Sequence, residues 1–558
     1  MFQLITNDFE GRHQRLISRD EFLKLVDEVK LTPQCHTLSE VLNRQKECMS
    51  NAQGKKQVYW LSDFQMTGVD LKEIPNDSTL NIQAYNLQPN AQQNIYIDSC
   101  WFETPYVALN ETNKLKVRIQ NVSSSDVENG SLNLKLNNVQ KALASYNVNK
   151  NSTTIVEMNI TVSLGGWNSA ELSITDHPIT FDDNLFFTFN VDPQIPVLSI
   201  NDKEKNLYIK AVYESNAYFN IKQVSAKSIN YDEFKNFKLI ILNEVQEVSS
   251  GLQQQLKQYV EKGGSLLILP NSTARAIVPA NNKFLQAMQV NVFDGIDNTK
   301  QKLSEINTQN ILFSDVFENK QANTDLPEIV KHYIINQALV PNQEVLLRLN
   351  NGDAFLCKYK LKEGLIYLSA APFNTEWTTL PKHALFVPIM YKMALLGNKQ
   401  LPLYSIIGRD KMVTLHQPIK SGEEMPGLMS SNIEIIPEIV NIQGKSTLYV
   451  PFLSASGIYT FKPRKGIDTV FQRIAFNYSR EESALKYYSG NQLESELASH
   501  HVHYLNAVSN VAEKAISETQ FRSSLWKWFV MLTLLFLALE ILLIKFYNPI
   551  VKIEIVKS

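Results

Sequence analysis

An apolar stretch near the end of the chain constrains its fold more than any other feature. The segment "LWKWFVMLTLLFLALEILLIKFY" (525–547) is interrupted only by the charged residues Lys527, Glu540 and Lys545. About 20 residues at a rise of ~1.5 Å each cross the hydrocarbon core of a bilayer. A core helix of a soluble domain is the alternative, but such a helix is rarely apolar on every face. The aromatic residues at its ends favour the membrane interface: Trp526, Trp528 and Tyr547. We therefore expect one transmembrane helix over 525–547.

The rest of the chain has the composition of several globular domains. At 558 residues and 44% hydrophobic content, it is long enough for about three or four domains, each with its own core. The 54 basic and 56 acidic residues give a formal net charge of −2, which is not the charge pattern of a nucleic-acid-binding protein. The cysteines form no CxxC pair and have no zinc-binding spacing. We expect free, mostly buried thiols at Cys35, Cys48, Cys100 and Cys357.

Changes in hydrophobic period divide the chain into domains. Residues 1–90 and 195–400 alternate apolar runs with helical spacing, which predicts parallel sheets with helices on their faces. Residues 92–192 and 403–480 show period-two alternation broken by Asn, Ser and Gly, which predicts a β-sandwich and a further β-rich domain. The polar segment 481–524 predicts a helical connector. The expected fold class is therefore multidomain α/β plus all-β, ending in a transmembrane helix.

Asp63 follows a predicted buried strand in "VYWLSDFQMTG" (58–68). Ligands and metals bind at the carboxyl ends of parallel strands, so an acid there is a candidate site residue. Thr37 precedes a predicted helix, and this Thr and Asp resemble two of the three metal loops of a von Willebrand factor A domain. Hard oxygen ligands of this kind suit magnesium. The third loop, DxSxS, is missing upstream, and "FQLIT" (2–6) is expected to be the second strand of such a domain. Thr37 and Asp63 are thus expected to be the remnant of an incomplete metal site. In the alternative, Asp63 caps a helix or faces solvent.

The segment "LKQYVEKGGSLLILP" (256–270) resembles the class I glutamine-amidotransferase-like fold. An active member needs a nucleophilic Cys on a strained strand-to-helix turn, with a His and an acid nearby. No cysteine lies between 194 and 356, and Cys357 is predicted in the middle of a strand. Ser272 is the best remaining nucleophile, and no spacing assigns His332 or His383 to it. A scaffold or binding domain is the expectation, with a hydrolase- or amidotransferase-like site as the alternative.

The order of these segments resembles that of the BatA-type (Bacteroides aerotolerance) membrane proteins. The resemblance is carried by "FQLITNDFEGRHQRLISRDEFL", "YWLSDFQ", "FDDNLFFTFNV", "YVEKGGSLLILP", "FNYSREESALKYYSGNQLESEL" and "LWKWFVMLTLLFLALEILLIKF". It implies a partial von Willebrand A-like domain over 1–90, an Ig-like β-sandwich over 92–192 and a flavodoxin-like, amidotransferase-like domain over 195–400. Family members typically begin with two membrane helices and a DNSFS-like metal loop. The resemblance therefore implies an N-terminally truncated chain, with magnesium bound only where that loop is present.

The resemblance also implies a location and a role. The body would lie in the periplasm with a short cytoplasmic tail, and the protein would serve envelope integrity or stress tolerance. We expect a non-enzymatic, membrane-anchored envelope protein that acts through protein–protein interaction, without a cofactor or a nucleic-acid partner. Its expected partners are the membrane and other envelope proteins. A third interpretation, a tail-anchored cytosolic protein, follows from the lack of a signal peptide in "MFQLITNDFEGRHQRLIS". Glu540 either faces a partner or snorkels to the interface.

Overall fold

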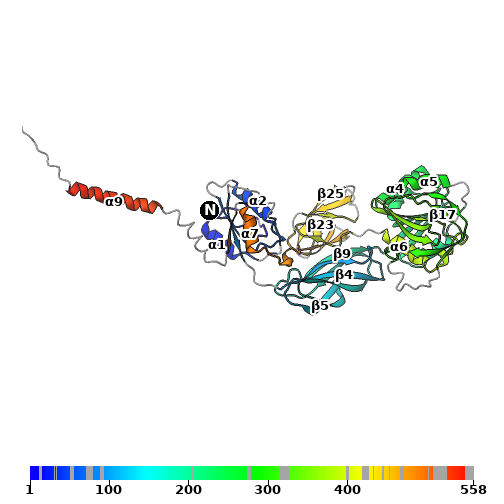
Figure 1. Cartoon of the computed structure of the whole chain (residues 1–558), viewed down its shortest axis with the longest axis horizontal. Helices are drawn as coiled ribbons and strands as arrows, with labels where there is room; N and C mark the ends of the chain where they lie inside the picture. Colours follow the sequence, from blue (N-terminus) through cyan, green and yellow to red (C-terminus); the bar gives the residue numbers. More distant parts are fainter. Residues whose placement is uncertain are drawn as a thin grey trace, which may run out of the picture. The chain divides into compact units, whose positions relative to one another are not determined.

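The chain folds into two compact units in its computed structural model (Figure 1). The first unit combines Met1–Gln92 with Glu481–Ser558, and the second is Gln93–Arg480. The second unit is therefore inserted into the first. The structure describes residues 1–9, 11, 15–30, 32, 34–50, 56–70, 80–87, 93–202, 205–272, 278–313, 326–397, 401–416, 426–430, 433–442, 445–450, 453–464, 470–500, 502–506 and 525–546.

A three-stranded parallel sheet organises the first unit. Its order is β1 (Lys56–Ser62), β2 (Leu80–Asn86) and β29 (Val502–Asn506). The helices of this unit's folded part are α1 (Arg19–Asp27), α2 (Leu38–Met49) and α7 (Gly490–Ala498). Leu42 of α2 and Leu493 and Leu497 of α7 pack against buried strand residues, including Val58 and Trp60. One face of β1 is thus buried, while Tyr59 and Leu61 on its other face are exposed.

Two segments of the first unit differ from their predictions. The segment 481–524, expected to be a helical connector, contains helix α7 and then strand β29, which pairs in parallel with β2. β29 belongs to the sheet because β2 offers it a free edge, although its sequence "VHYLN" is not a continuous apolar run. The segment "FQLIT", expected to be a strand, forms only an isolated bridge between Phe2 and Ile17. Residues 507–524 of the predicted connector lie outside the described residues.

The second unit begins with seven antiparallel strands in two sheets. One sheet has the order β3 (Ile95–Phe102), β4 (Thr112–Asn121) and β7 (Ser152–Thr161). The other has the order β6 (Val139–Val148), β5 (Val127–Leu136), β8 (Gly166–Ser173) and β9 (Asn184–Val191). Alternate residues of both sheets share one core, which includes Val117, Leu134 and Phe187. The period-two pattern predicted over 92–192 is therefore present as strands.

A nine-stranded mixed sheet follows in the order β11-β10-β12-β13-β20-β19-β18-β15-β16. Its strands are β10 (Ile195–Asn201), β11 (Phe219–Ser225), β12 (Leu239–Asn243), β13 (Ser265–Leu269), β15 (Gln301–Ile306), β16 (Glu328–Ile329), β18 (Gln343–Leu349), β19 (Ala354–Leu361) and β20 (Gly364–Ser369). The first five strands of that order are parallel, and the other pairs are antiparallel. The helices are α3 (Leu207–Glu214), α4 (Ser250–Glu261), α5 (Val278–Ala287) and α6 (Phe386–Leu396), and a separate pair is β14 (Phe293–Asp297) with β17 (His332–Ile335). β12 and β13 are buried at every position, as continuous apolar runs predict for central parallel strands.

The last part of the second unit is rich in short strands. Five form the order β21 (Ser405–Ile406), β28 (Gln472–Asn477), β27 (Gly457–Pro463), β23 (Pro426–Met429) and β24 (Glu434–Ile435). Three more form the order β22 (Met412–Thr414), β26 (Lys445–Tyr449) and β25 (Glu438–Ile442). The Asn477 side chain exchanges two hydrogen bonds of 2.8 Å with the main chain of Phe186. These bonds tie β28 to β9 of the preceding sheets.

Helix α9 (Leu525–Phe546) is the one helix among the described residues that is long and apolar enough to cross a membrane. Its described side chains are exposed to solvent all round, as a helix outside any protein core requires. Its bounds agree with the predicted span to within one residue. Tyr547, expected at its end, lies outside the described residues.

Candidate functional site

Thr37 and Asp63 lie at the loops where they were predicted, but they have different partners. Thr37 caps α2: its Oγ1 accepts from the Glu40 N–H (3.3 Å), and the Glu40 carboxylate accepts from the Thr37 N–H (3.2 Å). Asp70 accepts from both the N–H (2.9 Å) and the hydroxyl of Ser39 in the first turn of α2. These bonds lower the pKa of Asp70 against the opposing effect of desolvation. The two bonds between Thr37 and Glu40 show that Thr37 is the N-cap of α2.

Asp63 follows β1 and is half-buried. Desolvation raises its pKa, while backbone N–H donors, including that of Gln65, lower it. Its charge in turn raises the pKa of Glu482, which burial raises more strongly. Glu482 also contacts the Cys35 thiol, whose pKa rises to about 12 through burial and the nearby acids. Within the described residues no hydrogen bond joins Asp63 to Thr37, and a metal site at this edge stays a prediction.

The second unit has a richer polar cluster, at the carboxyl ends of β10 and β12. The next strand in the chain after β10, β11, lies on one side of β10, and β12 lies on its other side. Open α/β sheets bind ligands at such a switch point. Asn201 and Asn243 end the two strands in register, and the Asn243 Nδ2 donates to the Asn201 Oδ1 (2.9 Å). Asn206, the cap of α3, donates to the Phe373 carbonyl (3.1 Å) and to the Asn243 Oδ1 (3.4 Å). Amide groups thus fill the switch point of this sheet.

Glu244 stands next to these amides in an unusual backbone conformation. It follows β12 directly and has a φ of +52°, a region that long side chains rarely adopt. Its Oε2 accepts from the Ser272 N–H (3.2 Å), and its Oε1 accepts from the Asn374 Nδ2 (3.4 Å). The Asn271 Nδ2 donates to its main-chain oxygen (2.7 Å). Strained residues that the surroundings hold in place are concentrated at functional sites, so Glu244 is a candidate site residue.

Ser272, the nucleophile of the alternative interpretation, lies beside Glu244 but contacts it through its backbone N–H. In the part of the chain that the structure describes, no histidine is bonded to its hydroxyl. His332 is bonded to Asp353, and the Nδ1 of His383 accepts from the Leu385 N–H (3.1 Å). The Ser–His pair that acyl transfer needs is therefore not assembled among these residues.

The cysteines contribute no nucleophile at a strand end. None of the four forms a disulfide; Cys100 and Cys357 are buried, and Cys35 and Cys48 are half-buried. Cys357 lies in the middle of β19, as its sequence predicts, and burial raises its pKa. A thiol in such surroundings is unreactive.

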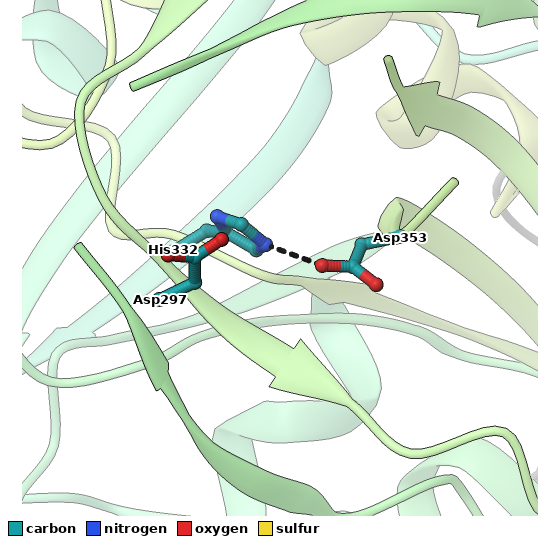
Figure 2. Close-up of side chains that lie close together, drawn as sticks. All are labelled: Asp297, His332 and Asp353. Carbon is teal, nitrogen blue, oxygen red and sulfur yellow. Dashed lines mark hydrogen bonds and ion pairs between the residues drawn. The ribbon is translucent and has the colours of Figure 1, made fainter. Parts of the chain in front are cut away.

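A second cluster, which the sequence interpretation missed, brings together Asp297, His332 and Asp353 (Figure 2). Asp297 ends β14 and His332 begins β17, and the two residues are paired in the antiparallel register. Asp353 comes from the turn before β19, and its Oδ2 lies 3.0 Å from the His332 Nε2. Candidate ligand atoms of the three residues all lie within 4.8 Å of one another. No short sequence motif links three such separate segments, whereas Glu244 carries the same signal as Asp63, an acid after a buried strand.

Comparisons with known proteins add little. No family model and no curated protein matches the chain. Among solved structures, two cytoplasmic proteins of Salmonella typhimurium are 14% and 13% identical, with TM-scores of 0.27 and 0.28. Each match covers 36% of this chain and 97% or 98% of the other. The CARDB domain of a Pyrococcus furiosus protein, solved with di-metal ions, is 10% identical with a TM-score of 0.16, over 18% of this chain and 88% of that one. Scores this low carry no argument about fold or function, and the resemblance to BatA-type proteins stays a prediction.

Proposed function

We propose that this chain is a non-enzymatic, membrane-anchored protein of the cell envelope that acts through protein–protein interaction. The observation that carries the proposal is α9, a helix long enough to span a bilayer, with its apolar side chains exposed all round. It follows β29 in the chain, so the anchor belongs to the same unit as the parallel sheet. The strand-rich body would then be held at the membrane surface, where it presents its domains to partners.

The polar cluster around Glu244 supports binding over turnover. Its amides are bonded to one another, and Glu244 is held by the Ser272 N–H and by Asn374. Such a set suits recognition of polar groups of a partner, and its amides and carboxylate form no nucleophile–base pair among the described residues. We therefore assign this strand-end cluster a binding role within the same proposal.

The envelope role and the domain types rest on the BatA-type resemblance and are part of the proposal. The first unit offers support: a parallel sheet with helices, Asp63 after β1 and Thr37 before α2 are what a partial von Willebrand A-like domain requires. The mixed sheet with helices α3, α4 and α6 supports the amidotransferase-like domain in the same way. In this proposal the body is periplasmic and the short tail cytoplasmic.

Membrane fractionation and protease access test the anchor and its orientation. The full chain is expected to remain in the membrane pellet after alkaline carbonate washing, and a chain ending before Leu525 is expected to be released. Protease added to intact spheroplasts is expected to digest the body. A carbonate-soluble full chain would overturn the proposed anchor. A protected body with a membrane-bound chain would favour the tail-anchored cytosolic interpretation.

The rival function is a hydrolase- or amidotransferase-like activity, favoured by the position of Ser272 beside the strained Glu244. A serine-reactive fluorophosphonate probe applied to the purified full chain distinguishes the two. We expect no labelling and no turnover of ester or amide substrates. Labelling that disappears in Ser272→Ala, but persists in a Ser228→Ala control, would establish the rival.

A further inference from the structure

We propose that Asp297, His332 and Asp353 together bind one divalent transition-metal ion of the Zn²⁺ or Mn²⁺ class. This inference concerns the second unit alone and does not depend on the proposed function. The three side chains come from β14, β17 and the turn before β19, so folding of the unit brings them together without any binding partner. Figure 2 shows the Asp297 side chain overlapping the His332 ring in this view, with a dashed line from the ring to Asp353.

The distances suit a shared ion. Metal–ligand bonds in such sites measure about 2.0–2.2 Å, so ligand atoms on one ion lie roughly 3–4 Å apart. The His332 Nε2 and the Asp353 Oδ2 are 3.0 Å apart, and all three candidate ligand atoms fall within 4.8 Å of one another. Asp297 is the more distant ligand, because the other two ligand atoms are only 3.0 Å apart. One imidazole nitrogen and two carboxylate oxygens form a mixed donor set, which divalent transition metals accept and which magnesium and calcium disfavour.

His332 is fully buried, so its ring has a fixed position in the cluster. Its side chain is 0% exposed, and its Nδ1 has no hydrogen-bond partner in the part of the chain that the structure describes. This nitrogen points away from Asp353, and the ligand to the ion would be the other ring nitrogen, Nε2. Its single hydrogen bond, to Asp353, directs the ring into the cluster. Coordination of an ion at Nε2 would replace this bond with a stronger attachment of the ring.

Charge and access favour a cation. The Asp353 side chain is 21% exposed and Asp297 is half-buried, so an ion can enter from solvent and keep water ligands. Neighbouring cationic side chains have partners of their own: Lys300 with Glu328 (2.6 Å), Arg348 with Glu305 (3.5 Å) and Lys331 over the Trp377 ring (4.6 Å). Among the described residues, none of these cations pairs with Asp297 or Asp353.

The competing explanation is that the two acids only stabilise turns. Asp297 accepts from the N–H (2.8 Å) and the hydroxyl (2.7 Å) of Thr299, and Asp353 accepts from the Asn351 Nδ2 (2.7 Å). Such bonds within a turn leave carboxylate lone pairs available, so they are compatible with a bound ion. They do not explain why a buried imidazole lies so close to both acids.

Calorimetry and electron paramagnetic resonance on the full chain in detergent, stripped of metal by a chelator, test the proposal. Titration with Zn²⁺ and, separately, Mn²⁺ is expected to show one site per chain, and the bound Mn²⁺ is expected to show coupling to one imidazole ¹⁴N. Asp297→Asn and Asp353→Asn should each weaken binding by about tenfold or more, because each removes a charged ligand. Asp294→Asn, an exposed acid of the same strand β14, is the matched control and should leave the affinity unchanged.

Circular dichroism checks that each variant is folded, and the Asp297→Asn variant is the decisive one because Asp297 lies at the rim of the cluster. The absence of a stoichiometric site for either ion would overturn the proposal and leave the three residues with a structural role. Binding that survives in both Asn variants, or that shows no ¹⁴N coupling, would place the ion elsewhere and equally overturn it. An excess of Mg²⁺ is expected to leave Mn²⁺ in place, and displacement by Mg²⁺ would contradict the proposed transition-metal class.

Discussion

Strand β1 of the first unit and strand β12 of the second are both followed by a residue with a left-handed backbone conformation. The two turns differ in which residue adopts that conformation. After β1, the left-handed residue is Phe64 (φ +49°), and Asp63 precedes it. After β12, the left-handed residue is the acid itself, Glu244 (φ +52°). Phe64 is 1% exposed, so burial of its ring offsets the strain, whereas Glu244 is only half-buried and is held by polar contacts. The comparison indicates that the first turn is stabilised by the core and the second by polar contacts.

The largest effect is expected from Phe64→Ala. Loss of a fully buried ring costs about 3–5 kcal/mol, and alanine keeps the strained conformation. Hydrogen exchange resolved by segment should therefore show faster opening of the first unit, with the second unit unchanged. Tyr59→Ala, on the exposed face of β1, is the control and should change little. Equal effects of the two substitutions would refute a structural role for the Phe64 turn.

A similar loss of stability is expected from Leu493→Ala. This variant tests whether helix α7 is part of the core that α2 and β1 form in the first unit. Leu493 is 0% exposed and packs with residues of α2 and β1, so truncation should destabilise the first unit by about 2–5 kcal/mol. Protection of amides in β1 should fall together with that in α7. Glu494→Ala, an exposed neighbour on α7, should have little effect. Unchanged protection of β1 would show that α7 does not complete this core.

A pH dependence is expected in the second unit, from Asp183. Burial, reinforced by the charges of Asp182 and Asp176, raises the pKa of this carboxyl from 3.8 to about 6. The folded state therefore binds the proton more tightly than the unfolded state, and stability should fall as pH rises from about 4 to about 6. Urea unfolding across this range measures the slope. Asp183→Asn should flatten it while the exposed-acid control Glu128→Gln does not, and an unchanged slope in Asp183→Asn would locate the effect elsewhere.

The smallest effect is expected at the second strained turn. Glycine adopts the left-handed region without penalty, so Glu244→Gly should be about 1 kcal/mol more stable than Glu244→Ala, which lacks the same contacts but keeps the strain. Thermal unfolding of the two variants side by side gives the difference. An alanine variant as stable as the glycine variant would mean that no strain is stored at this strand end, and the contrast with Phe64 would disappear.

The sequence predicts elements whose neighbours are near in the chain better than those whose neighbours are distant. Strands β12 and β13 can be predicted from their continuous apolar runs, because both faces of these strands are buried. Strand β29 cannot be predicted from its own sequence, because it forms by pairing with the edge of β2. That strand lies more than 400 residues earlier in the chain. The apolar "FQLIT" fails in the opposite way: it has a strand-like sequence but forms only a bridge between Phe2 and Ile17 and joins none of the three strands.

The same reasoning applies to the candidate sites. An acid after an apolar run is a local signal, which identifies Asp63 and which Glu244 carries too. Of the two strands, only β12 is buried on both faces. The left-handed φ that distinguishes Glu244 is a property of the folded backbone and has no local signature in a non-glycine residue. Asp297, His332 and Asp353 meet only through antiparallel pairing, whose register the residue types alone do not determine.

The insertion of one unit into the other sets an order for biosynthesis. The ribosome makes β1 and β2 first, but their third strand, β29, is made only after all of Gln93–Arg480 has been translated. Both ends of that inserted segment meet within its own fold, where the Arg480 Nε donates to the Ile97 carbonyl (2.9 Å). The inserted unit can therefore fold as soon as it emerges, while the second edge of β2 still lacks its partner β29. The sheet of the first unit is completed just before the apolar helix α9 is translated, so completion of this fold and synthesis of α9 are close in time.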